Sequence, residues 1–401
     1  MRKGWEKKKL NEFCEFSNGL WTGKKPPFQT VGVIRNTNFT KDCLLDDSDV
    51  VYLEVEQSQF QKRKLEFGDI ILEKSGGGPK QPVGRVVIFN KVEGHFSFSN
   101  FTSVIRVKDK NEVDYNYLHR FLFMEYISGA TEKMQSHSTG IRNLKFDEYK
   151  TIEIPLPPLP EQQRIVAILD EAFAAIAKAK ANAEQNLKNA KELFESYLQG
   201  VFENGKEFWE EKTLDKVCEF RNGAAHEQHI NEDGKYILVN SKFISADGEK
   251  FKRTNNALAP LFVNDIAFVM SDVPNGKALA KCFLVDENDT YTLNQRIGAI
   301  KSKVFVPDFL VYQFNRNRYL LSFNNGENQT NLRKGDILRC PIWLPSIEDQ
   351  QAIVRQLDAL RAETQRLEAI YQQKLADLEE LKKSILQKAF AGELTHKSIT
   401  S

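Results

Sequence analysis

Hydrophobic residues recur at steps of three and four over two long stretches of this 401-residue chain. The stretches run from Pro160 to about residue 203 and from Glu348 to about residue 391, and this spacing predicts amphipathic helices with a coiled-coil seam. Proline and acidic residues open each stretch, as at a helix start. The expected seam residues are Ile165, Leu169, Ala172, Ile176, Ala179, Ala183, Leu187, Ala190, Phe194, Tyr197 and Val201, then Ile353, Leu357, Leu360, Leu367, Tyr371, Leu375, Leu378, Leu381 and Ile385.

The chain before the first long helix has a different pattern. Short β-branched segments separated by turn residues predict strands at 50–55, 69–72, 83–89 and 101–107. A short helix is expected at 115–122, followed by a polar loop at 135–145 and an extended segment at 152–156. This part is therefore expected to be a mixed domain of strands and short helices.

The whole arrangement occurs twice. Gln162 and Gln163 return as Gln350 and Gln351, 188 positions later, and Trp5 at the start of the chain returns as Trp209. A repeat of this length predicts two copies of one structural unit. The predicted regions are a first globular domain (1–157), a helix (158–206), a second globular domain (207–345), a second helix (346–393) and a tail (394–401).

A long helix with one apolar stripe cannot bury that stripe alone, and its own repeat is the obvious partner. The predicted fold is therefore α+β: two mixed α/β domains separated by two long helices that form an intramolecular antiparallel coiled coil with pseudo-twofold symmetry. At 1.5 Å per residue, each rod would be about 65 Å long and would hold the two domains apart. The alternative is two independent helices that bind other proteins.

Composition limits the possible functions. Hydrophobic residues make up 41% and charged residues 28% of the chain, as in globular proteins. No apolar run reaches the roughly 18 residues of a membrane span, and no signal peptide is seen, so a cytoplasmic protein without a membrane partner is expected. Five widely separated cysteines predict neither disulfides nor a zinc site. The net charge of +1 means that any nucleic-acid surface must be local.

The order of these parts closely resembles the specificity subunit of type I restriction–modification enzymes. The resemblance covers nearly the whole chain. It rests on the segment from Ile154 to Gln163 and its echo from Pro341 to Gln351, and on the openings Trp5 to Gly19 and Trp209 to Gly223. A further repeated element is Asn-Leu followed by Lys145 or Arg333. Ser346-Ile347 departs from Pro158-Leu159 of the first copy.

The resemblance implies a non-catalytic subunit with two target-recognition domains, each of which reads one part of a split site in double-stranded DNA. Because the two domains differ in sequence, the site is expected to be asymmetric. The helices would act as spacer and as docking surface for two methyltransferase subunits, with Gln162, Gln163, Gln350 and Gln351 as docking residues. No cofactor is expected on this chain. S-adenosylmethionine, ATP and Mg²⁺ would belong to the methyltransferase and the restriction and translocase subunits.

DNA contacts need Arg, Lys, Asn and Gln near base edges and small polar or basic groups near phosphates. Loops are the expected carriers. In the first domain the candidates are Lys24, Lys25, Ser75, Gly77, Lys80, Arg85, Ser138, Thr139, Arg142, Asn143 and Lys145. In the second domain they are Asn222, Lys242, Asn275, Lys277, Gln295, Arg296, Gln329, Thr330, Asn331, Arg333 and Lys334. For any single residue the alternative is an ordinary solvated loop.

Sequence signatures of catalysis are weak. The stretch Lys25-Pro26-Pro27-Phe28 has lysine where an adenine methyltransferase needs a side chain that accepts a hydrogen bond. No phosphate-binding loop of the GxxxxGK[ST] type is found, and His226 and His229 lack the i, i+4 spacing of a zinc helix. No catalytic or metal-binding residue is therefore predicted. A self-contained nuclease or methyltransferase and a coiled-coil scaffold that does not bind DNA are the competing functions.

Overall fold

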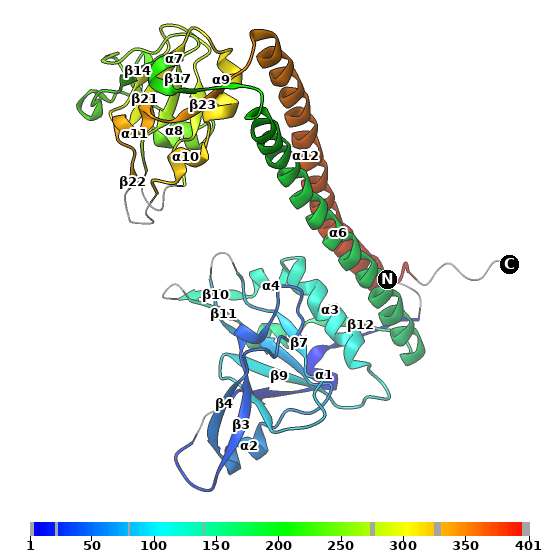
Figure 1. The fold of residues 1–401 in the computed structure, drawn as a ribbon. Coiled ribbons are helices and arrows are strands. Elements are labelled where there is room, and N and C mark those ends of the chain that lie inside the picture. The colour runs from blue at the N-terminus through cyan, green and yellow to red at the C-terminus, as the bar shows by residue number, and fades with distance from the viewer. Residues whose placement is uncertain are drawn as a thin grey trace, which may run out of the picture. The chain divides into compact units, whose positions relative to one another are not determined.

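The fold is that of a computed structural model, which describes residues 4–20, 23–78, 81–138, 141–272, 277–324 and 330–394. The chain divides into two compact units: unit 1 comprises Met1–Glu184 and Gln372–Ser401, and unit 2 comprises Gln185–Tyr371. The two long helices are α6 (Leu159–Gly205) and α12 (Ile347–Ala391). Each unit therefore contains one mixed domain and one half of each long helix (Figure 1).

The two helices pack against each other antiparallel within both units. In unit 1, Phe173 of α6 lies under Lys382 of α12, and Lys180, further along α6, pairs with Glu379, which comes earlier in α12. In unit 2, Phe194 lies under Arg361, and Tyr197 donates a hydrogen bond to Gln356. Since the partner number falls as the α6 number rises, the predicted antiparallel pairing is confirmed.

The seam differs from the prediction at three places. Leu381 and Tyr197, both expected on the seam, are 46% and 42% exposed. Thr364, which the hydrophobic pattern does not include, is only 2% exposed, and its hydroxyl donates to the carbonyls of Leu360 and Arg361 on the same helix. A buried threonine is tolerated here because its own helix satisfies its polar group.

The described residues of unit 1 form four small sheets. Their strand orders are β2-β9-β5-β7, β4-β3-β8, β10-β11-β6 and β1-β12. The strands are β1 (Glu6–Lys9), β2 (Cys14–Asn18), β3 (Phe28–Ile34), β4 (Val51–Glu56), β5 (Ile70–Glu73), β6 (Ser75–Gly77), β7 (Val86–Ile88), β8 (Phe96–Phe98), β9 (Thr102–Val107), β10 (Gln135–Ser138), β11 (Ile141–Leu144) and β12 (Glu153–Leu156). The short helices are α1 (Leu10–Phe13), η1 (Asn36–Asn38), α2 (Gln57–Lys62), α3 (Tyr115–Ile127), α4 (Ala130–Lys133) and α5 (Phe146–Tyr149).

Unit 2 repeats this plan in the same order. Its sheets are β14-β21-β17-β19, β16-β15-β20, β18-β22 and β13-β23. The strands are β13 (Glu210–Thr213), β14 (Cys218–Asn222), β15 (Tyr236–Val239), β16 (Lys252–Thr254), β17 (Ile266–Val269), β18 (Ser271–Asp272), β19 (Cys282–Leu284), β20 (Tyr291–Leu293), β21 (Ile297–Ser302), β22 (Thr330–Asn331) and β23 (Pro341–Leu344). The short helices are α7 (Leu214–Val217), η2 (Glu227–His229), α8 (Ser241–Ser245), α9 (Pro307–Phe314), α10 (Arg318–Leu321) and α11 (Lys334–Leu338).

The correspondence extends to strand direction. In each unit the four-stranded sheet is antiparallel. The sheets β4-β3-β8 and β16-β15-β20 each contain one parallel pair, which is β3 with β8 in unit 1 and β15 with β20 in unit 2. The sequence expectation is corrected at 135–145, where the predicted polar loop is the hairpin of β10 and β11. The hairpin satisfies the backbone groups of a polar segment that a loop would leave to water.

Helix starts explain why the equivalent helices α3 and α9 begin where they do. The Asp114 carboxylate caps α3 by accepting from the backbone N–H groups of Asn116 and Tyr117. Helix α9 instead begins with Pro307, whose missing N–H costs nothing in a first turn. Both helices then bury an aromatic residue at the same place, Tyr117 and Phe309.

The long helices belong to the hydrophobic cores of the domains. The core of unit 1 includes Ile165 and Leu169 of α6 with Leu386 and Phe390 of α12. In unit 2, Ile353 of α12 packs against the corresponding core cluster together with the end of α6. Each domain is therefore anchored on the helix pair by apolar burial.

Candidate nucleic-acid interface

In unit 1, strand pairing joins two segments that the sequence singled out separately. Strand β6 pairs with β11, which places Gly77 opposite Arg142 and Ser75 opposite Asn143. Ser138 ends the neighbouring strand β10. The Ser75 hydroxyl donates to the amide oxygen of Asn143. Five candidates, from segments more than 55 residues apart in sequence, therefore share one small sheet.

Unit 2 builds the same arrangement from other residues. Strand β18 pairs with β22, which places Ser271 opposite Asn331. The backbone N–H of Met270 donates to the Arg296 carbonyl at 3.1 Å, so the turn before β21 reaches the same place. Leu332 N–H donates to the Met270 carbonyl at 2.8 Å, just as Leu144 N–H donates to the Lys74 carbonyl at 2.8 Å in unit 1. We call the region around the paired strands β6 and β11 the strand-end surface of unit 1, and the region around β18, β22 and the turn at Arg296 the strand-end surface of unit 2.

Cations and an aromatic ring surround the strand-end surface of unit 1. Lys74 donates to the side-chain oxygen of Asn18 at 2.8 Å and lies 5.9 Å from the Phe146 ring. Lys150 lies 4.5 Å from the same ring. Burial lowers the pKa of Lys74, and the charge of Lys150 lowers it further. Lys150 also pairs with Asp147 at 3.0 Å, so Lys74 is the cation of this group that most favours a negatively charged ligand nearby.

The strand-end surface of unit 2 carries its cations on other elements. Arg333 is exposed and directly precedes α11. Lys334 is exposed and lies 5.6 Å from the Phe220 ring. Arg296 is exposed in the turn before β21, and Asn222 is exposed where β14 ends opposite Gly298. The predicted residues Asn222, Arg296, Asn331, Arg333 and Lys334 therefore gather around one end of the unit 2 sheets.

Other candidates lie on different elements. Lys24 and Lys25 precede β3, and the backbone N–H of each donates to the Glu56 carboxylate at 3.3 Å. Lys145, directly after β11, is exposed and lies 3.7 Å from Glu148. The other placements are Lys242 in α8, Lys277 at an exposed turn and Gln295 hydrogen-bonded to Glu227. Lys80, Thr139, Asn275 and Gln329 lie outside the described residues, as do the side chains of Ser138 and Thr330.

Arg85 does not fit a DNA-contact role, and that prediction is wrong. Its side chain is 7% exposed, and its guanidinium makes two hydrogen bonds of 2.8 Å with the Glu73 carboxylate, which is 1% exposed. It also donates to the carbonyls of Asn36 and Phe39. A guanidinium with these internal partners stabilises the domain and cannot reach a ligand.

Gln162 and Gln350 also have a different role from the predicted docking. Both are fully buried. The Gln162 amide accepts from Asp114 N–H at 2.9 Å and donates to the carbonyls of Glu112 and Pro157 at 3.0 and 2.8 Å. Three hydrogen bonds to the backbone fix the start of α6 to the loop before α3. A partner subunit cannot contact this side chain.

Gln350 makes the same three bonds in unit 2. Its amide accepts from Val306 N–H at 2.7 Å and donates to the carbonyls of Val304 and Pro345 at 3.3 and 3.0 Å. We call these two residues the glutamine clamps. The second glutamine of each pair, Gln163 or Gln351, is exposed and stays a candidate for docking.

Three residues at the unit 1 surface, Asn18, Lys74 and Lys150, were not among the predicted contacts. Asn18 lies at the end of β2, where Asn222 lies at the end of β14, and the repeat of Asn-Gly in the sequence could have identified it. Lys74 could have been found only from the strand pairing, because it stands next to Ser75 without a repeated counterpart: Met270 occupies its place.

Comparison with known proteins places the chain in a family. The model of the type I restriction modification DNA specificity domain matches residues 2–188 and 206–378, which cover both halves of the repeat. The chain therefore belongs to this family, and it is a specificity subunit of a type I restriction–modification system.

Two curated relatives match most of the chain. The specificity subunit of the EcoKI type I restriction enzyme of Escherichia coli (strain K12) is 26% identical over 390 residues, which cover 87% of this chain and 80% of that protein. The StySPI specificity subunit of Salmonella potsdam is 25% identical over 400 residues, with coverages of 90% and 82%.

Two solved structures share the fold. One, from a study of complex assembly and conformational transition of the type I R-M system, has a TM-score of 0.80 at 18% identity and covers 98% of this chain and 99% of that chain. The HsdS subunit from Thermoanaerobacter tengcongensis has a TM-score of 0.64 at 18% identity, with 98% of each chain covered. The predicted fold class is thereby confirmed.

Within the described ranges, no group of three or more His, Cys, Asp or Glu residues could hold a metal ion. No helix in the part of the chain that the structure describes is long and apolar enough to cross a membrane.

Proposed function

We propose that the strand-end surface of each unit reads one part of a split, asymmetric site in double-stranded DNA. The observation that supports this most is the repeated strand pairing, which gathers polar and cationic side chains at the same place in both units. Arg and Asn are the side chains that recognise guanine and adenine in the major groove. Both types occur on each surface: Arg142 with Asn143, and Arg333 with Asn331.

The asymmetry of the site follows from the unlike surfaces. The shared residues are a serine and an asparagine: Ser75 and Asn143 in unit 1, Ser271 and Asn331 in unit 2. The cations differ in position, so the two units would prefer different bases. Lys24, Lys25, Lys145, Lys242, Lys277 and Gln295 are proposed as additional contacts, for which phosphates are the simplest partners because these residues lie off the paired strands.

We further propose that the exposed face of α6 and α12 docks two methyltransferase subunits, near Gln163 and Gln351. The glutamine clamps support this role indirectly, because they fix each domain to the start of the helix that follows it. S-adenosylmethionine, ATP and Mg²⁺ would be bound by the methyltransferase and the restriction and translocase subunits. This chain would take part in no chemical step.

The test measures methylation of a library of DNA sites by the assembled complex of this chain with its methyltransferase subunits. Arg142→Ala is expected to relax the preference at one part of the site and Arg333→Ala at the other. Loss of one specific base contact costs about 1–3 kcal/mol, which is roughly tenfold to a hundredfold in selectivity. Lys303→Ala is the control, since Lys303 is 89% exposed and follows β21 at the end of that strand opposite to Arg296.

Three results would contradict the proposal. If Arg142→Ala and Arg333→Ala relaxed the same positions, the two units would not read separate parts. Turnover of DNA by this chain without partners would favour a self-contained nuclease or methyltransferase. If the assembled complex had no salt-dependent affinity for DNA, a scaffold without a DNA role would be favoured.

A further inference from the structure

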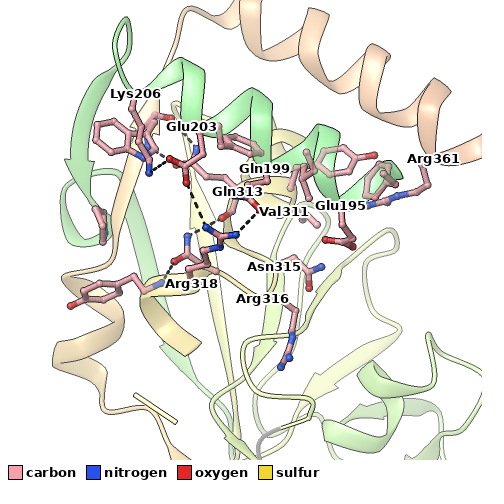
Figure 2. Close-up of a pocket in the computed structure, with 18 residues that line it drawn as sticks. Glu195, Gln199, Glu203, Lys206, Val311, Gln313, Asn315, Arg316, Arg318 and Arg361 are labelled. Carbon is pink, nitrogen blue, oxygen red and sulfur yellow. Dashed lines mark hydrogen bonds and ion pairs between the residues drawn. The ribbon is translucent and has the colours of Figure 1, made fainter. Parts of the chain in front are cut away.

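A groove in unit 2 has no part in the proposed DNA reading. It has a volume of about 580 Å³ and lies between the last turns of α6 and the segment from α9 to α10, with β23 at its base (Figure 2). Arg361 of α12 closes one end, near Phe194, and Lys206 lies at the other end. At 1.5 Å per residue, the α6 wall from Phe194 to Lys206 is about 18 Å long. This length suits a short peptide segment.

Positive charge predominates in the groove. Its lining contains four cationic side chains, Lys206, Arg316, Arg318 and Arg361, and two carboxylates, Glu195 and Glu203. Glu203 is shared, since it lies 3.0 Å from Lys206 and 3.8 Å from Arg318. The side chain of Arg318 is nevertheless 72% exposed, and its other partner is the neutral amide of Gln199. The groove therefore has positive charge available for an acidic ligand.

Aromatic rings form the rest of the walls. Trp343 lies 6.0 Å from the Lys206 ammonium, and Tyr312 lies 4.5 Å from the Arg361 guanidinium. Phe202 and Tyr319 also line the groove. Tryptophan, tyrosine and arginine are the residues that carry most of the energy in protein interfaces. Together they provide apolar contact area beside sites for carboxylates.

The corresponding place in unit 1 shows that the fold does not require these charges. A hollow of about 410 Å³ lies there between the end of α12, helix α3 and β12. Gln387 and Phe390 repeat Gln199 and Phe202 at an offset of 188. Helices α3 and α9 are related by an offset of 192, so Met124 stands where unit 2 has Arg316 and Tyr126 stands where it has Arg318. At the offset of 188, Pro155 stands where unit 2 has Trp343. The repeat thus builds a hollow in both units, and only the hollow of unit 2 is cationic and rich in aromatic rings.

We propose that the unit 2 groove docks an acidic peptide segment of a protein partner, with carboxylates paired to Arg318 and Lys206 and an apolar side chain against Tyr319 and Trp343. A peptide fits better than nucleic acid. The carboxylates of Glu195 and Glu203 would lie against a phosphate backbone, which carries a charge at every nucleotide. A peptide can place a neutral residue beside each of them. This inference is independent of the DNA role of the strand-end surfaces.

The test begins with the full-length chain and a random dodecapeptide phage library. Selection is expected to enrich sequences that combine Asp or Glu with an aromatic or aliphatic residue. The affinity of the most enriched peptide, labelled with fluorescein, is then measured by anisotropy. Arg318→Glu is expected to weaken its binding at least about tenfold, because one charged contact becomes repulsive. Lys303→Glu, an equal charge reversal at a highly exposed position of unit 2, should leave the affinity within about twofold.

Thermal unfolding of both variants checks that each is folded, and the high exposure of Arg318 and Lys303 makes a folding defect unexpected. The proposal is overturned if the enriched peptides are not acidic, or if the two charge reversals weaken binding equally. It is also overturned if duplex DNA displaces the peptide and Arg318→Glu weakens DNA binding instead, because the groove would then be a nucleic-acid site.

Discussion

The two units join their domains to the long helices with the same geometry but with different charge positions. In unit 1, Lys382 of α12 lies 4.9 Å from the Phe123 ring and 5.4 Å from the Phe173 ring of α6. In unit 2, Arg361 of α12 lies 5.0 Å from the Phe194 ring of α6 and 4.5 Å from the Tyr312 ring. Each junction therefore places a cation of α12 on a ring of α6.

The repeat itself does not predict this arrangement. At an offset of 188, Lys382 corresponds to Phe194 and Arg361 corresponds to Phe173. Equivalent positions thus carry a cation in one unit and a ring in the other, which distinguishes α12 from α6. If the end of α12 took the place of the end of α6 in unit 2, Lys382 would lie beside Arg361. The junctions are therefore not interchangeable, although the glutamine clamps beside them are alike.

Surrounding contacts strengthen the unit 1 junction. Lys382 also pairs with Asp42 at 2.6 Å. Burial by itself raises the pKa of Asp42, but the hydrogen bond and charge of Lys382 lower it on balance. Asp170 of α6 accepts from Arg120, and the equivalent Asp358 of α12 accepts from the Tyr312 hydroxyl. A charged pair in unit 1 is thus replaced by a neutral donor to a carboxylate in unit 2.

The interior of the unit 1 domain also contains a charged group where unit 2 has an apolar one, and this difference gives the largest expected effect on stability. Glu73 at the end of β5 corresponds to Val269 at the end of β17, and both are buried. Glu73→Val copies the residue of unit 2 but leaves the Arg85 guanidinium buried without its carboxylate. Removing one partner of a buried ion pair costs about 3–5 kcal/mol. Urea unfolding, with hydrogen exchange of unit 1 peptides, measures the loss of stability.

A matched pair of variants tests the cause. Glu73→Val combined with Arg85→Met removes both charges and is expected to be more stable than Glu73→Val alone, since no buried charge is left unpaired. Glu66→Gln breaks an exposed bond to Arg106 and should cost less than about 1 kcal/mol. If Glu73→Val were as mild as Glu66→Gln, the pair would have no special role in unit 1.

Sequence patterns show the long helices and the repeat because periodicity and starting signals are local. They do not show which side chains are satisfied internally. The partners of Arg85 are Glu73, Asn36 and Phe39, which only the folded sheets bring together. The polar segment of β10 and β11 likewise becomes a hairpin through a register that includes β6.

The clamp role of Gln162 could have been found from the sequence. Gln162 precedes the buried Ile165 by three positions, and Gln350 precedes Ile353 by three, so each lies on the apolar face of its helix. A glutamine on that face needs internal hydrogen bonds. Strand pairing brings the DNA candidates Arg142 and Asn331 onto the small sheets of their units, whereas Lys24 lies outside the strands.

The second expected difference between the units is sensitivity to acid. His119 of α3 is fully buried, and its Nε2 lies 3.1–3.2 Å from the carbonyls of Val86 and Cys43. Burial, and then the charge of Arg120, lower its pKa to about 4. Val311 occupies the equivalent place in unit 2. Only unit 1 therefore has a titratable group at this position.

The unfolded chain binds a proton at His119 near pH 6.5, whereas the folded chain does not until about pH 4. The contribution of neutral His119 to the unfolding free energy is therefore present above pH 6.5 and is lost as the pH falls toward 4. Between pH 6.5 and 5 the loss should be about 2 kcal/mol. The unfolding free energy of His119→Val should fall less over this range by about that amount. Equal pH dependence in both proteins would contradict the prediction.

The smallest expected effect concerns the unit 2 junction. Phe194→Lys places the residue of the equivalent position 382 beside Arg361, whereas Phe194→Leu removes only the ring. The lysine variant should be less stable than the leucine variant by about 1 kcal/mol, because it adds like-charge repulsion to the loss of a cation–π contact. Added salt should reduce this difference, since the junction is only partly buried. If both variants were equally stable at every salt concentration, the charge positions would not distinguish α12 from α6, and the two junctions would be interchangeable in energy.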